Sequence, residues 1–221
     1  MSVVYNGGLF KSINIFYAYF NVFFFVRLLI YTRLMLTSPA FLLKSTGQHF
    51  RRSFKFKPML HKVFVYGTLK RDEPNHYWLT KPENGLGNFI AEGTTKNKYP
   101  LIIATRYNIP FLLYSPGNGH NVKGEVYEVD DTMLSKLDIL EDHPNYYIRE
   151  IDYIEIIKAG KKEVEKCWVY FLKNFKPELL HRPTMECYSS SGSHGLPYME
   201  RSKRDPHYNY KVEIQDFKTS T

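Results

Sequence analysis

The sequence has few of the residues that build metal sites or disulfide frameworks. Only 2 of its 221 residues are cysteine, Cys167 and Cys187, and they show no metal-ligand spacing. They fit a reducing compartment, where they are expected to be small buried hydrophobic residues, although they could in principle pair. The common chemical motifs are also missing: there is no G-x-x-x-x-G-K-S/T phosphate loop, no G-x-G-x-x-G after a strand and no H-E-x-x-H. These absences argue against the enzyme classes that those motifs define.

Acidic residues are absent from the start of the chain. Residues 1–58 hold eight basic residues and no acidic one, whereas residues 59–221 carry 22 of each kind. The formal net charge of +8 therefore belongs to the first 58 residues, and the body is neutral. Because the body has no basic stripe with interleaved aromatic residues to follow a phosphate backbone, the composition argues against a nucleic-acid partner.

Residues 1–58 form a basic, apolar leader that lacks a long hydrophobic run. Its uncharged stretch from Ser12 to Val26 has 15 residues and ends at Arg27, whereas a membrane helix needs about 20. A mitochondrial presequence, a signal peptide or anchor, and an upstream extension of a protein that starts at Met59 all stay open, and the Phe and Tyr content favours the last two. We expect membrane contact only through this leader. The expected location is cytoplasmic if translation starts near Met59, and membrane-anchored or targeted if the leader is made and retained.

The body carries the pattern of a compact β-rich domain, with short apolar runs separated by turn residues. Aromatic residues make up 16% of the chain and provide enough bulky apolar surface for a core without disulfides. Turns at 117–119 and 159–161 are expected to close hairpins, a short helix is expected around 75–80, and the chain after Pro183 has no periodicity. The expected strands are 62–66, 88–95, 101–105, 111–115, 122–129, 147–157 and 164–172.

One further helix is clear from the pattern. Asp130 or Asp131 is the expected N-cap, and Pro144 is expected to stop the helix. Its apolar residues recur at helical spacing: Met133, Leu134, Leu137 and Leu140.

The first candidate site is the loop that follows the first strand, Tyr66-Gly67-Thr68-Leu69. Gly67 permits a tight backbone reversal, and successive backbone N–H groups in such a turn can hold a carboxylate or a carbonyl oxygen. The alternative is a plain turn in which Tyr66 belongs to the core.

The second candidate site is a pair of carboxylates at the end of the clear helix. Asp138 and Glu141 are three residues apart and face the same way, and carboxylates held close together raise each other's pKa. A carboxylate with a raised pKa is a usable base near neutral pH. The alternative is a solvated acidic helix end.

Both candidate sites lie within longer runs that match a known family. These runs are Val63 to Arg71, Pro74-Asn75-His76, Tyr99 to Ile103, Asn108-Ile109-Pro110 with Leu112-Leu113, Gly124 to Tyr127, Leu137-Asp138 through Glu141 to Tyr147 and Arg149, and Gly195-Leu196 with Tyr198. Over about residues 63–201 the chain resembles the γ-glutamylcyclotransferase-like proteins, and within them the γ-glutamylamine cyclotransferase branch.

The resemblance implies an α+β fold, a small mixed β-barrel with flanking short helices. It places the family's domain at residues 59–203, between the leader 1–58 and a C-terminal tail at 204–221. The implied reaction is an acyl transfer without metal or organic cofactor on a small-molecule γ-glutamyl substrate. The substrate's α-amino group attacks its own γ-carbonyl, which gives 5-oxoproline and releases the amine, such as the ε-amine of lysine.

The resemblance also assigns roles to residues. Glu141 matches the family's acid/base, and the loop of Tyr66, Gly67, Thr68 and Leu69 would hold the substrate through backbone N–H groups. Two alternatives stay open: a cyclotransferase for γ-glutamyl amino acids or glutathione, and a non-catalytic binding module with the same fold. The leaving amine and the oligomeric state do not follow from the sequence.

Overall fold

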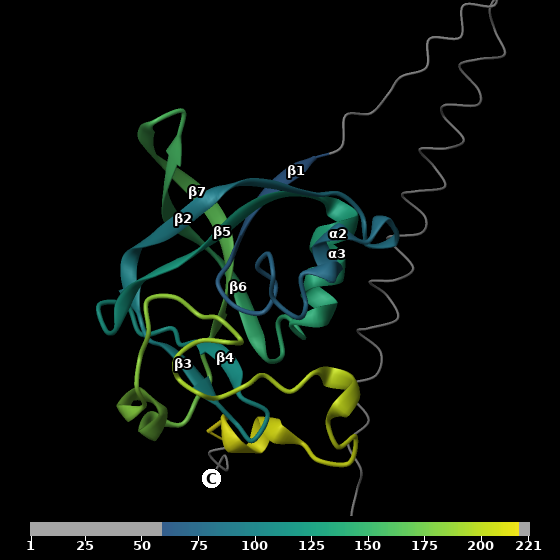
Figure 1. Cartoon of the computed structure of the whole chain (residues 1–221), viewed down its shortest axis with the longest axis vertical. Coiled ribbons are helices and arrows are strands. Elements are labelled where there is room, and N and C mark those ends of the chain that lie inside the picture. The colour runs from purple at the N-terminus through teal and green to yellow at the C-terminus, as the bar shows by residue number, and fades with distance from the viewer. Residues whose placement is uncertain (1–58, 217–221) are drawn as a thin grey trace, which may run out of the picture. The chain divides into compact units, whose positions relative to one another are not determined.

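The computed structural model describes residues 59–216 (Figure 1). The predictions for the leader 1–58 lie outside these described residues, and so does the end of the predicted tail, 217–221. Among residues 59–216, no helix is long and apolar enough to cross a lipid bilayer.

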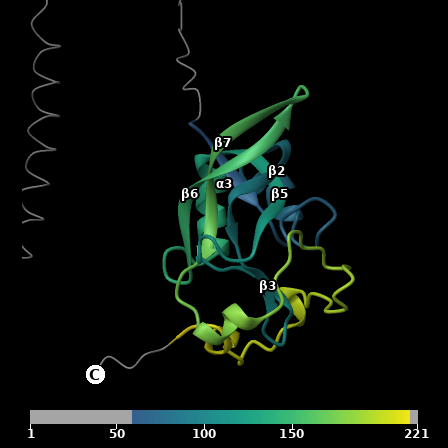
Figure 2. The same cartoon turned by 90° about the vertical axis from the view of Figure 1, so that its left-hand side faces the viewer.

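Five strands close into a barrel in the order β1, β5, β2, β6, β7, with β7 returning to β1 (Figures 1 and 2). Neighbouring strands run antiparallel, except β1 and β7, which run parallel. The bounds are β1 Leu60–Val65, β2 Gly87–Tyr99, β5 His120–Asp130, β6 Tyr147–Lys158 and β7 Lys161–Leu172. The predicted mixed β-barrel with short helices is confirmed.

The other elements are short and lie outside the barrel sheet. Strands β3 and β4 pair with each other as a separate two-stranded sheet. These elements are β3 Leu101–Ala104, β4 Ile109–Leu112, the α-helices α2 Tyr77–Thr80 and α3 Asp131–Leu140, and the 3₁₀ turns η1 Pro82–Asn84, η2 Pro177–His181, η3 Arg201–Lys203 and η4 Tyr210–Glu213.

The predicted strands are confirmed to within four residues at each end. The hairpin at 159–161 is also confirmed, because Lys158 pairs with Lys161 across it. The prediction of a hairpin at 117–119 is wrong. That turn leads into β5, but β5 pairs with β1 and β2, while the preceding strand β4 pairs with β3. The reason is that β2 continues to Tyr99, which lies opposite His120 and takes the place beside β5.

Helix α3 forms as its pattern predicts. The Asp130 side chain accepts a hydrogen bond from the Met133 N–H at 2.8 Å, and the four apolar residues of the helix are buried in the core. The helix ends at Leu140, before Pro144, because Asp142 adopts a φ of 51° that an α-helix does not accommodate. Glu141 is consequently the C-cap of α3 and begins the turn that follows it.

The C-terminal segment, residues 198–216, packs against the rest of the domain. Figures 1 and 2 both place it, in yellow, beside β3. The Met199 N–H donates to the Tyr107 carbonyl oxygen at 3.0 Å, and the Lys176 N–H donates to the Ile214 carbonyl oxygen at 2.8 Å. Ile214 is fully buried in the same core cluster as α3. Residues of the predicted tail therefore cover part of the core.

Candidate active site

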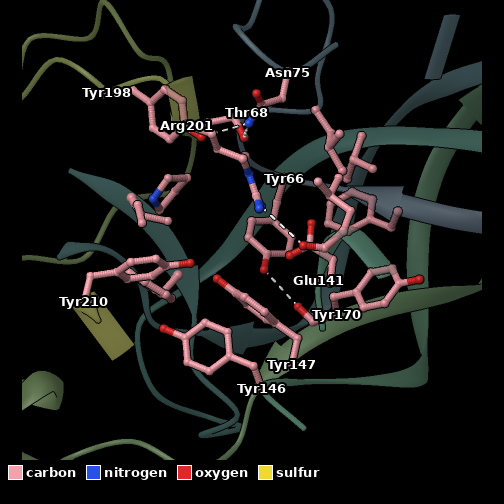
Figure 3. Close-up of a pocket in the computed structure, with 18 of the residues that line it drawn as sticks. Tyr66, Thr68, Asn75, Glu141, Tyr146, Tyr147, Tyr170, Tyr198, Arg201 and Tyr210 are labelled. Carbon is pink, nitrogen blue, oxygen red and sulfur yellow. Dashed lines mark hydrogen bonds between the residues drawn. The ribbon is translucent and has the colours of Figure 1, made fainter. Parts of the chain in front are cut away.

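One pocket collects side chains from parts of the chain that lie far apart in the sequence (Figure 3). The loop after β1, the end of α3, strand β4 and the C-terminal segment all contribute to its wall. All five residues singled out by the family resemblance line it: Tyr66, Gly67, Thr68, Leu69 and Glu141.

Hydrogen bonds hold the loop after β1 in place. The Thr68 carbonyl oxygen accepts from the Asn75 N–H at 2.9 Å, and the Asn75 side chain donates to Thr68 Oγ1 and to the Tyr198 hydroxyl, both at 2.9 Å. Within residues 59–216, neither the Thr68 N–H nor the Leu69 N–H donates a hydrogen bond. Two backbone donors of a pocket-lining loop thus stay available for a ligand.

Gly67 lies close to a neighbouring strand. The predicted backbone reversal is present, because the Lys70 N–H donates to the Gly67 carbonyl oxygen at 3.2 Å, but the φ of Gly67 does not lie in the left-handed region. A Cβ at this position would instead lie 3.0 Å from Cγ of Pro110, on β4. Glycine therefore lets the loop approach β4 closely.

Tyr66 belongs to the core, as the alternative interpretation of the loop expects, and it also lines the pocket. Its side chain is buried in the core, and its hydroxyl donates to the Tyr170 carbonyl oxygen at 2.8 Å. Burial and the nearby charge of Glu141 raise the pKa of Tyr66 well above its ordinary value. Tyr66 is thus a neutral hydrogen-bonded anchor that ties the start of the loop to β7.

Glu141 is the only acidic residue among the described residues that line the pocket. Burial raises the pKa of Glu141 to about 7, and the positive charge of Arg201 acts in the opposite direction. The Arg201 guanidinium donates to the Leu140 carbonyl oxygen at 3.3 Å, which holds it next to Glu141 at the end of α3 (Figure 3). A carboxyl group with this pKa exchanges a proton readily near neutral pH.

The predicted cause of the raised Glu141 pKa is wrong, because Asp138 does not contribute to it. The Asp138 carboxylate accepts a hydrogen bond from the Tyr170 hydroxyl at 2.7 Å and lies 3.2 Å from the Arg149 guanidinium, which compensates its charge. The alternative of a solvated acidic helix end does not describe Glu141, because its half-buried side chain lines the pocket.

Several wall residues were not singled out by the sequence pattern. Arg204 and Tyr210 come from the predicted tail, and Tyr146 lies in the turn before β6. For Arg204 and Tyr210 the only signal was the density of aromatic and basic residues between 198 and 211, which has no helical or strand period.

The two cysteines and the possible metal-ligating side chains do not form a second site among the described residues. Cys167 is buried and Cys187 is exposed, and both are free thiols, so the possible pairing is not found. Within residues 59–216, no group of three His, Cys, Asp or Glu side chains is placed to hold a metal ion.

The fold agrees with comparisons to known proteins. The profile of the family described as "Gamma-glutamyl cyclotransferase, AIG2-like" matches residues 63–190, more than half of the chain. The protein belongs to this family and is therefore an enzyme of the γ-glutamyl cyclotransferase class. The resemblance noted in the sequence is confirmed.

Individual proteins of this family are similar to the chain over about two thirds of its length. A Danio rerio protein named gamma-glutamylaminecyclotransferase C is 46% identical over 146 residues, 65% of this chain and 96% of that protein. A Drosophila melanogaster protein, named provisionally as a gamma-glutamylcyclotransferase, is 52% identical over 146 residues, 66% of this chain and 90% of its own length. The crystal structure of an AIG2-like protein from Mus musculus is 43% identical, with a TM-score of 0.63 over 66% of this chain and 99% of the mouse chain.

Proposed function

We propose that this protein is a γ-glutamylamine cyclotransferase. Its substrates are γ-glutamyl amines such as ε-(γ-glutamyl)-lysine, the isopeptide that joins a glutamyl side chain to a lysine. The observation that carries the proposal is the position of Glu141, a carboxylate with a raised pKa in the same pocket as the loop of Tyr66, Gly67, Thr68 and Leu69. The names of relatives such as the zebrafish protein support the choice of an amine as leaving group.

The proposed reaction is an intramolecular aminolysis. The α-amino nitrogen attacks the γ-carbonyl carbon, the carbon–nitrogen bond to the amine breaks, and the products are 5-oxoproline and the free amine. One proton leaves the attacking nitrogen and one joins the departing nitrogen, so no oxidant or other co-reactant is needed. Because the attack is intramolecular, holding the substrate in a cyclic conformation supplies much of the rate enhancement.

Glu141 acts as the general acid/base. The substrate's α-ammonium has a pKa of about 8 and is mostly protonated at neutral pH, so the nucleophile must first lose a proton. Glu141, with a pKa of about 7, accepts that proton and delivers one to the departing amine. Such catalysis contributes roughly 10²- to 10⁴-fold to the rate.

The loop after β1 is the proposed substrate-binding element. The N–H groups of Thr68 and Leu69, which donate to no atom of the described chain, hold the substrate and stabilise the oxyanion of the tetrahedral intermediate. Gly67 keeps this loop close to β4, and Tyr66 anchors its start to β7.

The proposal extends to cofactor, partner and location. The reaction uses a small-molecule substrate and requires no metal, organic cofactor or nucleic acid. We place it in the cytoplasm if translation starts near Met59, and at a membrane or targeted compartment if the leader 1–58 is made and retained. The mass of the mature N-terminus in cells tests this part.

The decisive experiment measures 5-oxoproline by mass spectrometry. The full chain is incubated separately with ε-(γ-glutamyl)-lysine, γ-glutamyl-alanine and glutathione. We expect product from the lysine isopeptide in the wild type and almost none in Glu141→Gln, which keeps the size of the side chain but removes the base. Circular dichroism of both proteins checks that they are folded.

A second candidate is a cyclotransferase for γ-glutamyl amino acids or glutathione. The broader name of the Drosophila relative, which is 52% identical, favours keeping it in the comparison. Product from γ-glutamyl-alanine or glutathione alone would select this candidate. A folded protein that binds these compounds without releasing 5-oxoproline would instead be a non-catalytic module.

A further inference from the structure

The pocket wall has a second cation, Arg204, and part of its hydrogen-bonding capacity is not used. Arg204 lies beside three tyrosine rings, 5.0 Å from Tyr198, 5.3 Å from Tyr107 and 5.5 Å from Tyr210, measured to the ring centroids. Its Nε donates to the Met199 carbonyl oxygen at 3.0 Å. Its Nη2 is buried and has no hydrogen-bond partner, and no ion pair within residues 59–216 involves this guanidinium.

A second unused polar group lies in the same wall. The Tyr146 side chain is only 4% exposed, lines the pocket, and has a buried hydroxyl without a partner. Burial raises the pKa of Tyr146, and the charge of Arg204 acts in the opposite direction, as expected for two neighbouring groups. A buried polar group without a hydrogen-bond partner destabilises the folded protein, and a charged one does so more strongly. Two such groups in one pocket wall therefore favour a ligand that satisfies both.

Contacts with the rest of the domain hold the segment that carries Arg204. On its C-terminal side, the Arg106 guanidinium stacks 3.4 Å from the Tyr208 ring centroid and lies 3.6 Å from the Glu213 carboxylate. Lys211 forms an ion pair with Asp142, which follows Glu141. The segment that carries Arg204 is thus tied to the domain beyond the pocket.

We propose that Arg204 and Tyr146 form a subsite that binds a carboxylate of the substrate. The proposal rests on the proposed function and deepens it by assigning a specificity-determining pair. A carboxylate accepts hydrogen bonds from a guanidinium and a hydroxyl at once and compensates the charge of Arg204. Arg201, the other cation of the wall, already donates to the Leu140 carbonyl oxygen and acts on Glu141.

The substrate offers two carboxylates with the same chemistry. One is the α-carboxylate of the γ-glutamyl group, and the other is the α-carboxylate of the departing lysine. Two analogues separate them: γ-glutamyl-cadaverine lacks the carboxylate of the leaving amine, and ε-(4-aminobutanoyl)-lysine lacks that of the glutamyl group.

The test measures binding by calorimetry in the Glu141→Gln background, where turnover does not interfere. Affinity for ε-(γ-glutamyl)-lysine and both analogues is compared with and without a second change, Arg204→Gln or Tyr146→Phe. We expect Arg204→Gln to weaken the binding of the isopeptide by about 10- to 100-fold, as for a charged hydrogen bond. We expect no effect on the analogue that lacks the recognised carboxylate, and Tyr146→Phe should follow the same pattern with a smaller loss.

The analogue that loses its sensitivity identifies which carboxylate the subsite binds. An equal loss for all three ligands would mean general damage to the pocket, and no loss for any of them would mean no subsite. Either result overturns the proposal. Lys203→Gln is the matched control, because it removes an exposed cation next to Arg204 that does not line the pocket, and it should leave all three affinities unchanged.

The wild-type assay for 5-oxoproline is read separately from this binding test. Absence of product from every γ-glutamyl compound would reject the proposed function, while the dependence of binding on Arg204 and a carboxylate would still be measured. Conversely, normal turnover together with affinities that are insensitive to Arg204→Gln would reject only the subsite.

Discussion

Replacing Glu141 with glutamine should stabilise the folded protein while it abolishes the reaction. Burial raises the pKa of this carboxyl group from 4.5 to about 7, which means that the folded protein tolerates the charged form less well than the unfolded chain does. At 1.36 kcal/mol per pKa unit, the difference amounts to up to about 3 kcal/mol.

The sign of this effect determines its pH dependence. Between about pH 4.5 and pH 7 the folded state keeps the proton that the unfolded state has lost, so the free energy of unfolding of the wild type falls as the pH rises. Glutamine stays neutral throughout. Glu141→Gln should therefore match the wild type below pH 4.5 and exceed its free energy of unfolding by up to about 3 kcal/mol at pH 8.

Urea unfolding of both proteins from pH 4.5 to pH 8 measures this difference in the free energy of unfolding. The contributions of titrating groups that both proteins share cancel in the difference. Asp142→Asn is the matched control, because hydrogen bonds from Lys211 and Asn145 lower the pKa of Asp142. Its stabilising contribution is present above its ordinary pKa, so its removal should destabilise the protein by an amount that stays constant from pH 5 to pH 8. A Glu141→Gln difference that does not change with pH would refute the reasoning that burial raises the pKa of Glu141.

Three further predictions follow from the same geometry. The kcat/KM for ε-(γ-glutamyl)-lysine should rise up to about tenfold per pH unit below pH 7, as Glu141 loses its proton, and reach a maximum between about pH 7 and pH 8, because at higher pH the substrate's α-ammonium has already lost the proton that Glu141 accepts. A profile that is flat from pH 5.5 to pH 7.5 would contradict the acid/base role. Gly67→Ala should lower kcat/KM about tenfold, since its Cβ would lie 3.0 Å from Cγ of Pro110 and displace the loop, and unchanged kinetics would show that the close approach is not needed. Asp130→Ala should cost about 1 kcal/mol in urea unfolding, because it removes the cap on the Met133 N–H, with little change in activity.

Local patterns account for the parts of the fold that were predicted well. Helix α3 follows from residues within its own length, namely the cap at Asp130 and four apolar side chains at helical spacing. The strands follow from short apolar runs bounded by turns, and the β6–β7 hairpin follows from its own turn at Ala159 and Gly160. The pairing of β5 was missed because its partners β1 and β2 are chosen by register and closure of the whole sheet, which no local pattern contains.

The candidate site, too, was predicted only in those parts that local sequence determines. Sequence runs led to Glu141 and to the loop that begins at Tyr66, but the explanation offered for the raised pKa, a nearby Asp138, was wrong. That pKa depends on burial by side chains from distant parts of the chain and on Arg201, which lies 60 residues further along. Arg204 was not identified, because it comes from a segment without periodicity.

By itself, then, the sequence determined the family, the succession of short strands around one capped helix, and the residues to examine first. Each of these depends on side chains close together along the chain or on runs that match known relatives. Only the tertiary structure decided which strands pair, what surrounds Glu141, and that Arg204 reaches the same pocket. The physical reason is that burial and charge act through space, between groups that closure of the barrel and packing of the C-terminal segment bring into contact.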